Sequence, residues 1–308
     1  MSKALDISAC GAKPRDLAAR GARWLHFRSL LLRILTWGAA ALTALVMAFL
    51  IGYILFRGVP NLHLSLFAWT YTTENVSMTP AIFNTVILVA LALLVAVPLG
   101  VGSAIYLVEY APRKSPLVKV IRMTTETLSG IPSIVYGLFG FLMFGVALKW
   151  GYCILSGALT LAIMVLPLIM RTTEEALLSV PDLFREGSFG LGAGRVRTVF
   201  SIVLPAAMPG ILSGVILAIG RIVGETAALI FTAGTTPKVP GFSAGGGFFS
   251  TLISPLMRSG RTLAVHMYAL LNEGLYTNQA YATAVVLLAV VIGINALSGV
   301  LARRLSKG

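Results

Sequence analysis

The chain has 308 residues, of which 57% are hydrophobic and only 11% are charged, whereas roughly 25% of the residues of a soluble globular chain are charged. These proportions exclude an ordinary soluble enzyme and predict one polytopic membrane domain. The formal net charge of +13 would indicate nucleic-acid binding in a soluble protein, but here the positions of the basic residues explain it by membrane topology.

Six apolar stretches are long enough to cross a membrane as helices, since about 20 helical residues span the hydrocarbon core. They lie near residues 30–56, 81–108, 123–148, 152–171, 206–233 and 279–302. The first follows a basic tail, residues 1–29, and is too long for the apolar core of a cleavable signal peptide. The sequence therefore predicts an all-α membrane protein in which a cytoplasmic tail precedes a transmembrane domain of residues 30–308.

Lysine and arginine are distributed unequally between the loops of this predicted bundle. The segments that would face one side are the N-terminal stretch through Arg33, 109–122, 171–205 and the C-terminus, and together they hold eighteen of the 24 basic residues. The alternate segments hold five, and Arg221 is the remaining one. Because cytoplasmic loops are enriched in Lys and Arg, we expect both termini to be cytoplasmic and the protein to lie in a plasma membrane, in a bacterium the inner one. No nucleic-acid partner is needed to explain the charge.

Arg221 and Glu225 are the only charged residues in the predicted span at 206–233. A charge near the bilayer centre costs at least about 2.5–3.5 kcal/mol on insertion scales, so such residues usually have a function. Their i, i+4 spacing predicts that both lie on one helical face, one turn apart. Arginine stays charged and offers a planar fork of donors to an oxyanion, which predicts an anion pathway at Arg221. The alternative is a structural ion pair between packed helices.

The cytoplasmic segment 172–205 is too long for a simple turn. Its run Ser179-Val180-Pro181-Asp182 predicts a helix start with Pro181 in the first position and an acidic residue near the positive helix end. A short amphipathic helix over 183–189 would follow, and the glycines after it predict a bend between two short helices.

The external segment 234–278 is glycine-rich and includes Gly245-Gly246-Gly247. We expect a flexible loop there; the alternative is a backbone that offers N–H groups to an anion. A short helix lying at the outer surface is predicted over residues 262–273.

The cytoplasmic segment also carries a motif spread over twenty residues. It reads Glu186-Gly187-Ser188, three residues, Gly192, nine residues, and Ile202-x-Leu204-Pro205. This run resembles the EAA motif of the membrane subunits of ABC importers that are fed by binding proteins, with Gly-Ser in place of Ala-Ala. The resemblance implies that about residues 181–195 form a coupling helix that docks in a groove of an ATPase subunit, with the bend at Gly192. The implied coupling-loop residues are Asp182, Glu186, Gly192, Ile202, Leu204 and Pro205.

The chain has no Gly-Lys-Ser or Gly-Lys-Thr phosphate loop, and the glycine run at 190–194 lacks the surrounding βαβ unit of a nucleotide-binding turn. We therefore expect a transport subunit that is not itself an enzyme. ATP and magnesium would be bound by a partner ATPase, with no cofactor in this chain. The three histidines and two cysteines do not have the spacing of a metal site.

Three further segments, 130–140, 221–227 and 278–284, resemble the permeases of high-affinity phosphate importers, and the last resembles the A-type permease. The resemblance implies a type I ABC importer permease fold and ATP-driven import of inorganic phosphate by alternating access. It also implies a complex with a homologous C-type permease, two ATPase subunits and an extracytoplasmic phosphate-binding protein, embedded in membrane lipid.

Two roles for Glu225 stay open beside such a substrate. It would either hold Arg221 in place when no phosphate is present or accept a proton that phosphate carries and sulfate lacks. Two alternative functions also stay open. One is a permease of the same class for molybdate or sulfate, and the other is a membrane scaffold that reports phosphate status to signalling proteins.

Overall fold

The computed structural model describes residues 14–112, 115–239 and 253–305, and every regular element within these ranges is helical. The chain divides into two units, residues 1–56 and 57–308. The first unit contains most of α1 (Pro14–Gly58), a continuous helix. Its stretch Arg28–Asn61 is long and apolar enough to cross a membrane, in agreement with the span predicted at 30–56.

The second unit contains the remaining elements, which follow in chain order. Two 3₁₀ turns come first, η1 (Val59–Asn61) and η2 (Leu64–Phe67). The next helices are α2 (Thr79–Ile105) with its π-helical extension η3 (Tyr106–Tyr110), α3 (Pro116–Ser129), α4 (Ser133–Gly140) with its π-helical extension η4 (Phe141–Ala147), and α5 (Ile154–Leu178). Then come α6 (Asp182–Gly190), α7 (Arg195–Thr198), the π-helical η5 (Val199–Val203), α8 (Leu204–Val223), α9 (Ala227–Thr232), α11 (Leu263–Glu273) and α12 (Thr277–Leu305).

Five described helices are long and apolar enough to span a membrane, and a sixth span results if α3 and α4 with η4 count as one. The third predicted span, 123–148, is divided in the structure, because α3 and α4 meet at an angle of 102°. The break lies at residues 130–132, where Pro132 lacks a backbone N–H and restricts the residue before it. The fifth predicted span is also displaced, since the continuous helix runs over Arg195–Val223 instead of 206–233.

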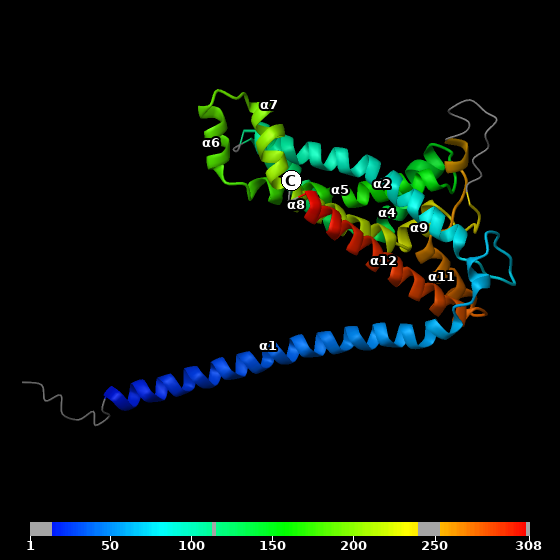
Figure 1. Ribbon diagram of the computed structural model, residues 1–308, viewed down its shortest axis with the longest axis horizontal. Helices are drawn as coiled ribbons and strands as arrows, with labels where there is room; N and C mark the ends of the chain where they lie inside the picture. The colour runs from blue at the N-terminus through cyan, green and yellow to red at the C-terminus, as the bar shows by residue number, and fades with distance from the viewer. Residues whose placement is uncertain (1–13, 113–114, 240–252, 306–308) are drawn as a thin grey trace, which may run out of the picture. The chain divides into compact units, whose positions relative to one another are not determined.

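The helices pack through small residues. On α2, the side chains of Ala92, Ala96 and Ala104 are buried, and Gly100 meets Ile169 of α5. Small residues four apart let two helix backbones approach closely, which is how membrane helices associate without a hydrophobic driving force. The helices α2, α5, α8 and α12 form the body of the unit, with α6 and α7 at one end and α11 at the other (Figure 1).

The helix predicted at 262–273 is confirmed by α11 (Leu263–Glu273), and its predicted position at the outer membrane surface stays a prediction. The side chains of Leu263, Val265, His266 and Leu270 are fully buried. Thr262 begins this helix by accepting a hydrogen bond from the backbone N–H of Val265. The glycine-rich run at 245–247 lies outside the described residues.

Candidate functional site

The fifth span is interrupted beside the two charged residues that the sequence singles out. Arg221 lies in the last turn of α8, which ends at Val223, and Glu225 lies in the three-residue break before α9 (Ala227–Thr232). The expected placement of both side chains on one helical face is therefore wrong. The Glu225 carboxylate instead accepts a hydrogen bond of 3.1 Å from the backbone N–H of Ala228, in the first turn of α9. Gly224 and this local capping bond explain why the chain leaves the helix here.

The break between α8 and α9 lies next to the break between α3 and α4. A side chain on Gly137 of α4 would meet the Cα atom of Ala228 at 2.7 Å, so the two helices touch backbone to backbone. The buried Tyr136 donates a hydrogen bond of 2.8 Å to the carbonyl of Leu128 at the end of α3, which satisfies an otherwise open helix-terminal acceptor. Arg221 lies close enough to Tyr136 to interact with it electrostatically. Two interrupted helices therefore meet at the arginine.

A cavity of about 550 Å³ extends from Arg221 along α5 to Leu178, toward the end of the bundle at which α6 and α7 lie. Its α5 wall runs from Pro167 to Leu178, and α3 forms another wall. Gly210 of α8 lies against Ala176, and Gly214 lies against Thr172. Because α8 runs antiparallel to α5 in this register, Arg221 is level with about Pro167, at the end of the cavity farthest from α6.

Basic and acidic side chains both line this cavity. Two ion pairs are formed, Arg122–Glu174 at 2.5 Å and Arg171–Glu175 at 3.0 Å. No ion pair joins Arg221 to Glu225 or to any other residue that the structure describes. The alternative of a structural Arg221–Glu225 pair is thus not realised, and the half-buried Arg221 lines a cavity to which both charged and apolar side chains contribute.

The segment 172–205 forms the two short helices that its sequence predicts. Pro181 precedes α6, Asp182 lies in the first turn, and α7 begins at Arg195. Gly192 has a φ of +83° between the two helices, a left-handed conformation that favours glycine and confirms the predicted bend. A buried hydrogen bond of 2.8 Å between the Ser188 and Thr198 hydroxyls fixes α6 against α7.

The last residues of the motif lie where the chain re-enters the bundle. Ile202 is in the π-helical turn η5, and Leu204 and Pro205 are in the first turn of α8. Glu186 is exposed on α6. Large apolar side chains are exposed around the same two helices, among them Leu183 at 77% and Leu191 at 91%. This loop therefore presents an apolar surface with exposed charges of both signs, and the described part of the chain leaves it uncovered.

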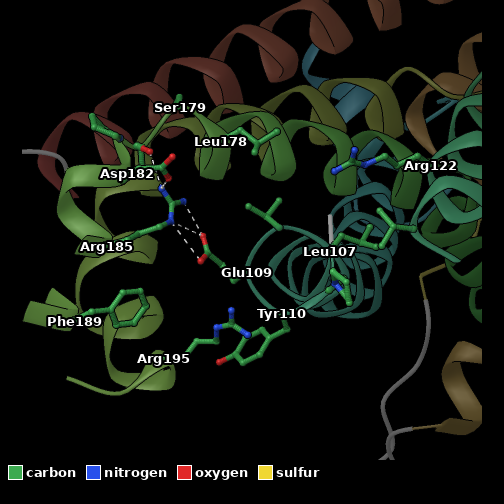
Figure 2. A pocket seen from close by; sticks show the side chains of 16 residues that line it. Leu107, Glu109, Tyr110, Arg122, Leu178, Ser179, Asp182, Arg185, Phe189 and Arg195 are labelled. Atoms are coloured by element: carbon green, nitrogen blue, oxygen red, sulfur yellow. Dashed lines mark hydrogen bonds and ion pairs between the residues drawn. The ribbon is translucent and has the colours of Figure 1, made fainter. Parts of the chain in front are cut away.

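One arginine joins this loop to the bundle, as Figure 2 shows. Arg185 of α6 lies in a cavity of about 910 Å³ between Asp182 and Glu109. Its guanidinium also donates hydrogen bonds to the carbonyls of Leu177 and Val180, which satisfies acceptors at the end of α5. Beside it, the Arg195 guanidinium lies 5.8 Å from the centre of the Tyr110 ring, a cation–π contact. These contacts hold α6 and α7 against η3, the end of the second span.

Sequence reasoning singled out Arg221 and the segment 172–205 but missed the ion pairs that surround them. The Arg185–Glu109 pair connects residues 76 positions apart, so no local pattern could reveal it. The Arg122–Glu174 pair likewise joins distant segments. The i, i+4 spacing of Arg171 and Glu175 is a readable signal for an ion pair on a helix surface.

Comparison with known proteins shows which family and which solved structures this chain is similar to. Residues 96–307 match the model of the family described as binding-protein-dependent transport system inner membrane component. The chain is 39% identical over 244 residues to the probable ABC transporter permease protein YqgI of Bacillus subtilis, covering 77% of this chain and 81% of the relative. It is 31% identical over 256 residues to the phosphate transport system permease protein PstC of Mesorhizobium japonicum, covering 75% of each chain.

It is also 38% identical over 178 residues to the phosphate transport system permease protein PstA 1 of Mycobacterium tuberculosis, covering 56% of this chain and 58% of the relative. Two solved structures share the fold. A methionine ABC transporter aligns with a TM-score of 0.54 at 18% identity, over 83% of this chain and 97% of that one. A bacterial alginate ABC transporter in complex with its periplasmic protein aligns with a TM-score of 0.62 at 15% identity, over 91% and 98%. The likeness confirms the type I ABC importer permease fold.

Proposed function

This chain belongs to the family of binding-protein-dependent transport system inner membrane components, and on that premise we propose that it is the A-type permease subunit of an ATP-driven importer of inorganic phosphate. Its relatives include permeases named for phosphate transport. The chain is a multi-pass membrane protein, and we place both of its termini in the cytoplasm because of the distribution of its basic residues.

The observation that carries the proposal is the position of Arg221 in the cavity, together with the lack of an ion-pair partner for it among the described residues. Arg221 lines the end of a cavity that also contains charged side chains from α3 and α5, and it has no carboxylate partner within the described part of the chain. A cationic group kept unpaired at membrane depth is costly unless it serves an anion. Inorganic phosphate carries one to two negative charges at neutral pH and accepts the bidentate hydrogen bonds that an arginine fork offers.

The transport cycle requires partners that this chain does not supply. A homologous C-type permease completes the passage, two ATPase subunits bind ATP and magnesium, and an extracytoplasmic binding protein delivers phosphate. The exposed apolar side chains of α6 and its neighbours supply the surface on which an ATPase subunit docks. Glu186 and Asp182 add negative charge to this surface.

Alternating access follows from the contacts of Arg185, which attach α6 to the ends of α2 and α5. ATP binding closes the ATPase dimer and moves α6, and Arg185 transmits the movement to the ends of α2 and α5. The passage then opens outward, and the binding protein releases phosphate toward Arg221. Release of ADP and phosphate from the ATPase returns the helices to the inward-open state. Glu225 keeps α9 capped at the break beside the arginine.

Uptake of labelled phosphate by the reconstituted complex tests this proposal. We expect ATP-dependent uptake that unlabelled phosphate competes away and that equal concentrations of sulfate or molybdate leave intact. Competition by sulfate or molybdate instead would identify a permease for another oxyanion. A complex that assembles but transports none of the three anions would favour the signalling scaffold.

A further inference from the structure

The cavity below Arg221 contains a second arginine that the proposed function has not used. The α5 wall of this cavity extends over eleven residue steps, Pro167 to Leu178, which correspond to about 16 Å of helix. This length is close to half of the roughly 30 Å of a hydrocarbon core. Because Arg221 is level with the deep end, an anion released there has to travel the length of α5 before it reaches the cytoplasm.

Arg171 lies on this wall and is held only loosely. Its Nε atom donates to Glu175 Oε1 at 3.0 Å, and its Nη atoms donate to none of the described residues. The two side chains are 65% and 64% exposed, and exposed ion pairs of this kind contribute little to stability. An anion can therefore take the place of the Glu175 carboxylate at small cost.

The other arginine of the cavity is held more firmly. Arg122 of α3 is 2.5 Å from Glu174, whose side chain is only 14% exposed. This pair joins α3 to α5 and leaves Arg171 as the exchangeable cation between Arg221 and the cytoplasm. A second carboxylate, Glu126 of α3, lines the cavity and acts electrostatically on Arg171. It adds to the repulsion that an arriving anion meets.

We propose that Arg171 forms an inner subsite for inorganic phosphate and that Glu175 controls how long the anion stays there. Phosphate leaving Arg221 displaces the Glu175 carboxylate from Arg171 and binds the freed guanidinium. The carboxylate then returns to Arg171 and expels the anion into the cytoplasm. No covalent bond changes in this exchange. The inference rests on the proposed function, because it names the exit route of that same substrate.

The test uses the whole complex, with its partner permease, ATPase subunits and binding protein, in proteoliposomes. ATP-dependent uptake of labelled phosphate is measured while the concentration of unlabelled phosphate on the ATPase side is varied. Glu175→Gln removes the competing carboxylate, so the phosphate concentration that halves uptake should fall roughly two- to five-fold. Arg171→Gln removes the subsite, so this concentration should rise by a similar factor.

The opposite signs of the two shifts separate a subsite from structural damage, which would move both variants in one direction. Lys119→Gln is the matched control, because it removes one positive charge from an exposed position of α3 outside the cavity. It should behave as wild type. Two variants that equal wild type, or that shift together, would overturn the subsite while leaving the phosphate importer standing. A wild-type complex without phosphate uptake would overturn both.

Discussion

Arg185 and Glu109 form a forked ion pair that joins α6 to the end of the second membrane span. The Arg185 Nη2 atom lies 2.7 Å from Glu109 Oε1, and its Nε atom lies 3.1 Å from the same oxygen and 3.4 Å from Oε2. The side chains are only 14% and 8% exposed. A forked contact between charged groups fixes orientation as well as distance, so a displacement of α6 has to carry the end of that span with it.

Glu109→Gln should uncouple ATP hydrolysis from transport. Removing one partner of a buried ion pair typically costs about 3–5 kcal/mol, but Asp182 and two carbonyls still hold Arg185, so we expect a smaller loss. The ATPase subunits should still bind, while more ATP is hydrolysed for each phosphate imported. Parallel measurements of both rates check this. Glu273→Gln, an exposed charge on α11, is the control. Equal loss of both rates would contradict a coupling role.

Gly192→Ala should weaken the attachment of the ATPase subunits. Its φ of +83° places the residue where a Cβ atom costs roughly 1–2 kcal/mol, although no neighbouring atom would be touched. The strain should turn α7 relative to α6 and reduce the amount of ATPase that co-purifies. Gly190→Ala is the matched control, because it also meets open space but lies in α6. Similar losses in the two variants would count against the bend.

Gly137→Val should separate the two interrupted helices. The nearest atom to a new side chain is the Cα of Ala228 at 2.7 Å, and a backbone atom cannot move aside as a flexible side chain can. Overpacking of this kind typically costs about 1–3 kcal/mol. We expect the solubilised complex to melt at a lower temperature and to import less phosphate. Gly130→Val, whose nearest atom is 3.5 Å away, should have a much smaller effect; equal effects would refute the close approach.

His266 should make the protein sensitive to acid. Burial, and then the charge of Arg261, lower the pKa of His266 to about 4. The Arg261 guanidinium lies 3.2 Å from its Nδ1 atom, and the Tyr71 ring packs edge-on against it. The folded protein therefore binds this proton less readily than the unfolded chain, whose histidines have a pKa near 6.5.

The contribution of His266 is fully present above about pH 6.5 and is lost as the pH falls toward 4, by about 3 kcal/mol in total. Thermal unfolding of the solubilised protein between these pH values should show this loss. His266→Gln should flatten the dependence, whereas His63→Gln, at an exposed position, should leave it unchanged. A dependence that survives His266→Gln would assign the acid sensitivity to other groups.

The sequence predicts the helical membrane fold well, because long apolar stretches leave few alternatives to spanning helices. It also predicts the bend at Gly192 from local turn chemistry. The sequence prediction fails at the break after Val223. The apolar pattern continues through Gly224, and the i, i+4 spacing of Arg221 and Glu225 is also the spacing of two residues on one helical face. The capping contact from Glu225 to Ala228 decides the outcome, and a helical pattern does not reveal it.

The cavity and its charges could not be predicted from the sequence either. The register of α5 against α8 depends on close contacts such as that of Gly214 with Thr172, which only the packed helices establish. Arg122, Arg171 and Arg185 look in the sequence like ordinary cytoplasmic charges that set the topology. Their carboxylate partners show that each also has a specific structural position.

The most direct test of the account is phosphate uptake by a complex that carries Arg221→Lys. Lysine keeps the positive charge but loses the planar fork that binds two oxygens of one anion. We predict that the complex assembles fully, with partner permease and ATPase subunits at wild-type ratios, and that its initial rate of labelled phosphate uptake falls at least about ten-fold. Wild-type uptake by the assembled Arg221→Lys complex would contradict an anion passage at this arginine.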